Sequence, residues 1–169
     1  MILLLALSLV ALLFWVGLTL DRTRSWPGEL MLDTEPGRSE DVVVAIVPAR
    51  DEAEVIAASL GSLLQQSHEA LSILVVDDGS TDDTAAIVRD VGDTSSRVCG
   101  LVTAAAPRDG WSGKVSALAT GVDEANERWP QIDWLLFTDA DIAHHPESVR
   151  ALIACAREDD RDLVSVMAR

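Results

Sequence analysis

Four short polar clusters hold the residues whose types and spacing could do chemistry. In chain order these clusters are PARDE (48–52), DDGS (77–80), GWSGK (110–114) and DAD (139–141). In the last of them, Asp139 and Asp141 place two carboxylates with one residue between them, just after the largely apolar run IDWLLFT. Carboxylates repel each other, but a hard cation such as Mg²⁺ or Mn²⁺ prefers oxygen ligands of this kind. Taken alone, the pair could equally cap a following helix.

The other clusters add groups that suit a phosphorylated ligand. A divalent cation at DAD would neutralise a diphosphate leaving group and act as a Lewis acid. Asp77 and Asp78 could accept hydrogen bonds from a base or a ribose, although DDGS is also common turn material. Gly113 and Lys114 offer a close backbone approach and a cation for phosphate.

Several better-known sites are excluded by their missing motifs. The chain has no G-x-x-x-x-G-K-[ST] loop, no G-x-G-x-x-G after its first strand, and no CxxC or Cys/His cluster. Cys99 and Cys155 are expected to be reduced, buried thiols. His144 and His145 follow DAD and are more typical of loop or cap residues. A place for one of them near the metal is the alternative.

The clusters follow apolar runs that alternate with helical patterns. The predicted strands are 42–47, 71–76, 97–104, 132–138 and 162–167. The predicted helices are 51–66, 80–91, 110–129 and a last one after Pro146, the first capped by Asp51 with Glu54 and the second by Ser80. This alternation predicts an open, mostly parallel α/β sheet with flanking helices. Ligands bind outside the carboxyl ends of such strands, where all four clusters fall.

The first twenty residues form an uncharged apolar stretch. A helix of that length is about 30 Å long, which matches a bilayer core. Arg22 and Arg24 follow it, so the positive-inside rule predicts a single-pass protein of the cell membrane with its soluble part in the cytoplasm. A cleaved signal peptide and a buried helix are the alternatives. Residues 21–40, rich in Pro and Gly, are expected to be a linker, and 41–169 the domain.

Composition narrows the classes of partner. Of the 169 residues 49% are hydrophobic, enough for a folded core, and the formal net charge is −15. Such an acidic chain is not expected to bind nucleic acid, nor anionic lipid through a basic patch.

The segments VAIVPARDE, ILVVDDGSTDDT, GWSGK and LLFTDADI, in this order, resemble family 2 glycosyltransferases of the Rossmann-like GT-A fold, over residues 42 to about 167. GWSGK, TDADIAHHP and DLVSVM, with the leading apolar segment, look most like the hopanoid-biosynthesis-associated branch. The resemblance implies an inverting transfer from a nucleotide-diphospho-sugar, with a divalent cation. It places these residues around the donor: Pro48, Ala49, Arg50, Glu52, Asp77, Asp78, Gly113, Lys114 and Asp139, with Asp139 and Asp141 at the metal. Asp51 departs from the family pattern, which usually has Asn there.

In that family the general base lies in a later segment, so no catalytic residue is assigned here. The chain is therefore expected to be the donor-binding half of a transferase, and its membrane segment points to a lipid acceptor. Three rivals stay open: a receiver-like signalling domain, a phosphatase with a nucleophilic D-x-D, and a nucleotide-sugar-binding module without catalysis. Asp77 and Asp139 are 62 residues apart, which is too far for a receiver domain.

Overall fold

The computed structural model describes residues 8–12, 14–17, 39–95, 97–107, 109–158 and 160–166. The chain divides into two units, Met1–Asp33 and Thr34–Arg169. In the first unit, residues 8–12 and 14–17 are helical and exposed. No helix in the described part of the chain is long and apolar enough to cross a membrane. The rest of the predicted span 1–20, and the predicted linker up to residue 38, lie outside the described residues.

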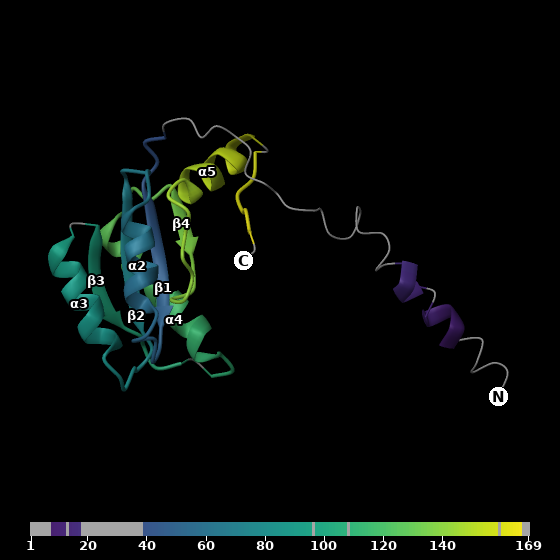
Figure 1. Ribbon diagram of the computed structural model, residues 1–169, viewed down its shortest axis with the longest axis horizontal. Helices are drawn as coiled ribbons and strands as arrows, with labels where there is room; N and C mark the ends of the chain where they lie inside the picture. Colours follow the sequence, from purple (N-terminus) through teal and green to yellow (C-terminus); the bar gives the residue numbers. More distant parts are fainter. Residues whose placement is uncertain are drawn as a thin grey trace. The chain divides into compact units, whose positions relative to one another are not determined.

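The described part of the second unit is built on a four-stranded sheet, which is parallel as the sequence predicts. The strand order is β3-β2-β1-β4 (Figure 1). The strands are β1 (Val43–Ala49), β2 (Leu71–Asp77), β3 (Val98–Thr103) and β4 (Trp134–Phe137). Val43 at the start of β1 lies opposite both Leu71 and Trp134, so β1 is hydrogen-bonded on its two sides. Its run of apolar residues suits this central place, because both of its faces are buried.

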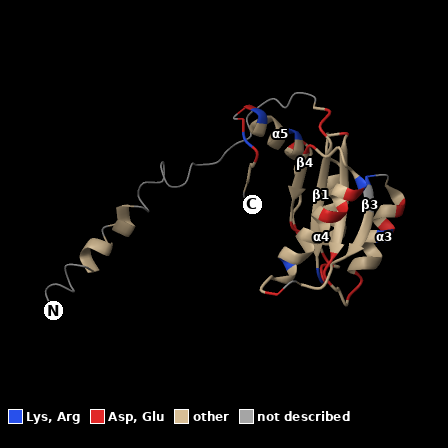
Figure 2. Cartoon of the chain, turned by 180° about the vertical axis from the view of Figure 1, so that it is seen from behind, with Lys and Arg blue, Asp and Glu red and all other residues tan. Residues whose placement is uncertain are grey.

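Helices cover both faces of the sheet. They are α2 (Ile56–Leu64), α3 (Thr84–Thr94), α4 (Gly113–Arg128) and α5 (Ser148–Glu158). Alternate residues of β1 enter different cores, since side chains alternate along a strand. Val43, Ala45 and Val47 pack with residues of α2, α3 and α5, whereas Val44 and Ile46 pack with residues of α4. Accordingly, α2 lies in front of the sheet in Figure 1 and α4 in front of it in Figure 2.

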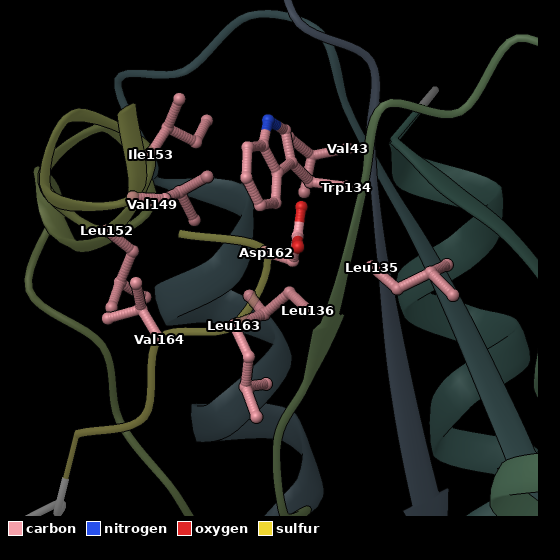
Figure 3. A pocket seen from close by; sticks show the side chains of 11 residues that line it. Val43, Trp134, Leu135, Leu136, Val149, Leu152, Ile153, Asp162, Leu163 and Val164 are labelled. Carbon is pink, nitrogen blue, oxygen red and sulfur yellow. The ribbon is translucent and has the colours of Figure 1, made fainter. Parts of the chain in front are cut away.

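The predicted fifth strand is wrong for residues 162–166, which form no strand. The backbone N–H of Arg161 donates to the carbonyl of Ala156, 2.8 Å away, and so turns the chain at the end of α5. The next residues, Asp162 to Val164, then lie over β4 and α5 around an apolar cavity of about 90 Å³ (Figure 3). The side chain of Leu163 is 79% exposed, so this segment buries little apolar surface.

The predicted helix caps are also wrong. Helix α2 begins at Ile56 after Val55, and α3 begins at Thr84 after Asp83, neither with a side-chain cap. Asp51 and Ser80, which were predicted to cap these helices, bond instead to the turn that follows β2.

Gly121 allows α4 to approach the sheet closely. A Cβ atom at this position would lie 2.5 Å from Cγ2 of Ile46 and 3.0 Å from Cγ2 of Val76. Ile46 and Val76 are both fully buried, so neither methyl group has free space to move into. The short distance between α4 and the sheet therefore depends on the absence of a side chain at Gly121.

We expect Gly121→Ala to lower the free energy of unfolding, measured by urea denaturation. Overpacking a core costs about 1–3 kcal/mol, against a helix-propensity gain of roughly 1 kcal/mol at most. Gly61→Ala in α2 is the matched control, because a Cβ there meets nothing within 4 Å. It should raise stability by about 0.5–1 kcal/mol. Equal effects of the two substitutions would contradict the close approach at Gly121.

Candidate functional site

A cavity of about 420 Å³ lies at the carboxyl end of the sheet. Its lining residues are Pro48, Ala49, Arg50, Glu52, Asp78, Gly113, Lys114, Asp139, Ala140 and Asp141. These residues come from the four polar clusters, and nine of them are the predicted site residues. Asp77 is the one predicted residue that does not line the cavity. Ala140 was not predicted, although its place between the two aspartates of DAD could have indicated it.

The lining carries more negative than positive charge. Glu52, Asp78, Asp139 and Asp141 contribute four negative charges, and Arg50 and Lys114 two positive ones, which leaves a net charge of −2. Nζ of Lys114 lies 2.7 Å from Oδ1 of Asp139, and Nη1 of Arg50 lies 3.6 Å from Oδ2 of Asp78. Acidic and basic positions accordingly lie together at the lower end of the sheet in Figure 2. Both cations are thus paired with acidic groups of the same cavity.

Asp51 joins the loops that follow β1 and β2. Its backbone φ is +54°, in the left-handed region that Asp and Asn tolerate better than most residues. Its Oδ1 accepts hydrogen bonds from the backbone N–H of Thr81 at 2.7 Å and from its hydroxyl at 3.1 Å, and its own N–H donates to Oγ of Ser80 at 3.1 Å. Asn has an oxygen in the same place and the same backbone tolerance, so the departure from the family pattern leaves this geometry intact.

Two more bonds join the same loops. The N–H of Glu52 donates to the Thr84 hydroxyl at 2.8 Å, and the N–H of Ala53 donates to Oδ2 of Asp82 at 3.1 Å. Hydrogen bonds from the Thr84 hydroxyl and then from its backbone N–H lower the pKa of the Asp82 carboxyl. These contacts fix the loop that brings Arg50 and Glu52 to the cavity.

Asp77 has a turn-forming role in the structure. Its Oδ1 accepts hydrogen bonds from the backbone N–H of Ser80 at 3.1 Å and from the Ser80 hydroxyl at 2.5 Å. Its carbonyl accepts from the N–H of Ala104 at 2.8 Å. This is the turn chemistry that the sequence analysis left open, and the contact of Asp77 with a base or ribose stays a prediction.

Gly113 brings the carboxylate of Asp78 to the start of α4. Gly113 is the first residue of this helix, and its N-cap Ser112 accepts a hydrogen bond from the N–H of Val115 at 3.3 Å. A Cβ atom at Gly113 would overlap the Asp78 carboxylate. The glycine therefore permits this approach, and the positive end of the helix dipole favours the negative charge there.

The DAD loop offers two carboxylates for a metal ion. Asp139 and Asp141 are both exposed, and the buried Ala140 lies between them. Within the described part of the chain, no group of three or more His, Cys, Asp or Glu side chains could hold a metal ion. Two carboxylates nevertheless fit a cation such as Mg²⁺, which takes one or two of them and completes its shell with water and substrate phosphates.

The two histidines after DAD are loop residues and are absent from the cavity lining. Nε2 of His144 shares a hydrogen bond of 2.8 Å with the Thr138 hydroxyl, and Nδ1 of His145 accepts from the N–H of Glu147 at 3.3 Å. Burial lowers the pKa of the His144 imidazole.

The sheet and its cavity define a Rossmann-like α/β domain with an acidic cavity at the carboxyl end of its strands. The chain belongs to glycosyl transferase family 2, because the sequence model of that family matches residues 44–169. Membership in this family excludes the receiver-domain and phosphatase alternatives.

Known relatives agree with this assignment. The chain is 36% identical over 110 residues to 4,4'-diaponeurosporenoate glycosyltransferase of Staphylococcus aureus (strain MRSA252), an alignment that covers 64% of this chain and 26% of the relative. The chain thus spans about a quarter of the length of this curated relative.

Solved structures share the fold. The mannosyltransferase PcManGT from Pyrobaculum calidifontis, in complex with GDP-Man and Mn²⁺, is 26% identical with a TM-score of 0.57, covering 73% of this chain and 35% of that one. TarS 1–349 of S. aureus in complex with UDP is 23% identical with a TM-score of 0.52, covering 69% and 32%. The likeness to TarS concerns the fold alone.

We expect Asp51→Asn to change the free energy of unfolding by less than about 0.5 kcal/mol, since Asn suits both the backbone and the hydrogen bonds. Asp51→Ala should lower it by about 1–2 kcal/mol, because it loses both. Asp160→Ala is the control: Asp160 also has a positive φ, of 50°, and lies outside the cavity. In thermal unfolding, a loss at Asp51 no larger than that at Asp160 would argue against the role of the hydrogen bonds.

The lowered pKa of His144 predicts a pH dependence of stability. The folded protein binds the imidazole proton less readily than the unfolded chain does, so the free energy of unfolding should fall as the pH drops through about 6.5. Above that pH both states hold neutral His144 and the effect vanishes. His144→Gln should flatten this part of the profile in urea unfolding between about pH 7.5 and 5.5. Identical profiles for the wild type and the variant would refute the prediction.

Proposed function

We propose that the domain binds a nucleotide-diphospho-sugar together with Mg²⁺ or Mn²⁺, as the donor half of an inverting glycosyltransferase. One observation carries this proposal: nine residues predicted from four separate segments line one cavity. The cavity volume of about 420 Å³ falls within the range of roughly 300–1,000 Å³ that is usual for ligand pockets.

Charge is the reason for including a cation. A lining with a net charge of −2 would repel a diphosphate, and Lys114 and Arg50 are already paired with acidic groups. Asp139 and Asp141 would hold the divalent cation, which when bound supplies charge neutralisation to the diphosphate. Lys114 would then exchange its contact with Asp139 for one with a phosphate oxygen.

The other lining residues would recognise the nucleoside. Asp78, whose side chain is 17% exposed, has a fixed carboxylate that can accept hydrogen bonds from a base or a ribose. Arg50 and Glu52 lie on the loop attached to the turn after β2 and can contact the same ligand. The bound GDP-Man and Mn²⁺ of PcManGT support a donor of this chemical class and a divalent cation for this chain.

We further propose a membrane location, with residues 1–20 as a single span, the domain on the cytoplasmic side, and a lipid acceptor. The support is the uncharged apolar sequence and the two arginines that follow it. The hopanoid-associated branch stays a prediction, and the relatives named 4,4'-diaponeurosporenoate glycosyltransferase do not favour it. No residue is proposed as the general base, so donor binding is the activity assigned to this segment.

Calorimetric titration of the full chain with UDP, GDP and their sugars, with and without Mn²⁺, tests the proposal. We expect one nucleotide series to bind, and to bind tighter with Mn²⁺. Asp141→Asn should weaken the Mn²⁺-dependent binding about tenfold or more, because even the loss of an outer-shell partner of a metal ligand typically costs about 10–100-fold.

Asp123→Asn, at an exposed position of α4, makes the same change of charge outside the cavity and should bind like the wild type. Equal binding with and without Mn²⁺, or an Asp141→Asn variant that binds like the wild type, would refute the metal assignment. Sugar transfer would separate an active transferase from a binding module.

A further inference from the structure

Gln66 is a buried amide that bonds to a distant part of the chain. It lies two residues after the end of α2 and is only 3% exposed. Its Nε2 donates to the carbonyl of His145 at 2.8 Å, and its Oε1 accepts from the N–H of Val149 at 3.1 Å. Val149 lies in the first turn of α5. A single side chain thus holds the loop that precedes α5 and also satisfies a backbone donor at the start of that helix.

Two serines near Gln66 bond to the same loop. Oγ of Ser62, in α2, accepts from the N–H of His144 at 2.9 Å. The N–H of Ser67 donates to the carbonyl of Pro146 at 2.8 Å, and its hydroxyl donates to Oε2 of Glu147 at 2.8 Å. With the two bonds of Gln66, five hydrogen bonds join residues 62–67 to residues 144–149.

This attachment continues into the DAD loop. His144, fixed by Ser62, shares a 2.8 Å hydrogen bond with the hydroxyl of Thr138, the residue just before Asp139. The N–H of Thr138 donates to the carbonyl of Ile46 in β1 at 3.3 Å. The loop is therefore fixed at its start by the sheet and at its end by the polar residues of 62–67.

We propose that Gln66 and Ser62 are positioning residues for the two carboxylates of the DAD loop. Neither residue lines the cavity. They act by holding the loop where Asp139 and Asp141 both face the donor, so they set the affinity for the metal-bound nucleotide. This inference rests on the proposed function and adds to it a second group of residues, which lie outside the cavity lining.

Ser59 provides a matched control within α2. It is 2% exposed, and its hydroxyl has no hydrogen-bond partner in the described part of the protein. A role of α2 in general stability would involve Ser59 and Ser62 alike. A role in positioning the loop would involve Ser62, whose hydroxyl bonds to His144, and would not involve Ser59.

The test is calorimetric titration of the full chain with UDP and with GDP, each with and without Mn²⁺, next to thermal unfolding of every variant. Gln66→Met and Ser62→Ala should bind the preferred nucleotide about tenfold more weakly with Mn²⁺, as losses of outer-shell partners typically do. Without Mn²⁺ their affinity should stay within about twofold of the wild type. Ser62→Thr, which keeps the hydroxyl, should restore binding, and Ser59→Ala should match the wild type.

Variants with a lower Tm but an unchanged ratio of affinities with and without Mn²⁺ would overturn the positioning role. If Gln66→Met does not fold, Ser62→Ala is compared with Ser62→Thr instead. The ratio of the affinities with and without Mn²⁺ then decides whether the positioning role holds. A wild-type chain that binds neither nucleotide with Mn²⁺ would refute the proposed function, and the positioning role with it. Normal wild-type binding beside unchanged variants would refute the positioning role alone.

Discussion

The parallel pairing of β1 with β2 on one side and β4 on the other is the constraint on which the site depends. Ala49 at the end of β1 lies opposite Asp77, while Phe137 at the end of β4 lies opposite Ile46. Strands that run in the same direction bring their carboxyl ends to one end of the sheet, so the loops that follow them have to meet there. The apolar residues of β1 suit this order, because a central strand of a parallel sheet is covered on both of its faces. The cavity is thus a consequence of how the core is packed.

The ion pairs in the cavity are suited to exchange. Lys114 and Asp139 are 58% and 53% exposed, and exposed pairs of this kind contribute only about 0–1 kcal/mol. Replacing either partner by a ligand or a cation should therefore lower the stability of the fold only slightly. Asp78 differs, since its side chain is 17% exposed and lies against the start of α4, which keeps its carboxylate in place. The cavity thus combines a fixed acidic group, Asp78, with an exposed one, Asp139, that can change partners, which suits the proposed binding of a diphosphate with a cation.

Local patterns of the sequence predicted the four strands of the sheet and the four polar clusters that supply the lining of the cavity, whereas the individual donor-side residues were implied by the family resemblance. They succeeded because runs such as VVVAIV carry a strand signal within a few residues and the clusters follow directly. They failed where contacts between distant segments decide the structure. Asp51 accepts hydrogen bonds from Thr81, 30 residues away, and Gln66 donates to His145, 79 residues away. No sequence period or motif indicates either contact. The predicted strand at 162–167 failed for a related reason: its apolar residues are typical of a strand, but the turn at Arg161 places Asp162 to Val164 over β4 and α5, where they form no strand.

The position of the acidic loop combines two opposed requirements. Under the proposed function, side chains that bind an exchangeable cation have to be exposed, yet they bind it well only if their geometry is fixed beforehand. Asp139 and Asp141 meet the first requirement and have no burial of their own to fix them. Buried or half-buried groups behind the loop meet the second: Ala140 packs into the core, Thr138 bonds to β1, and Gln66 holds the far end. Because an amide carries no charge, Gln66 can be buried with both of its ends hydrogen-bonded and adds nothing to the repulsion between the two carboxylates.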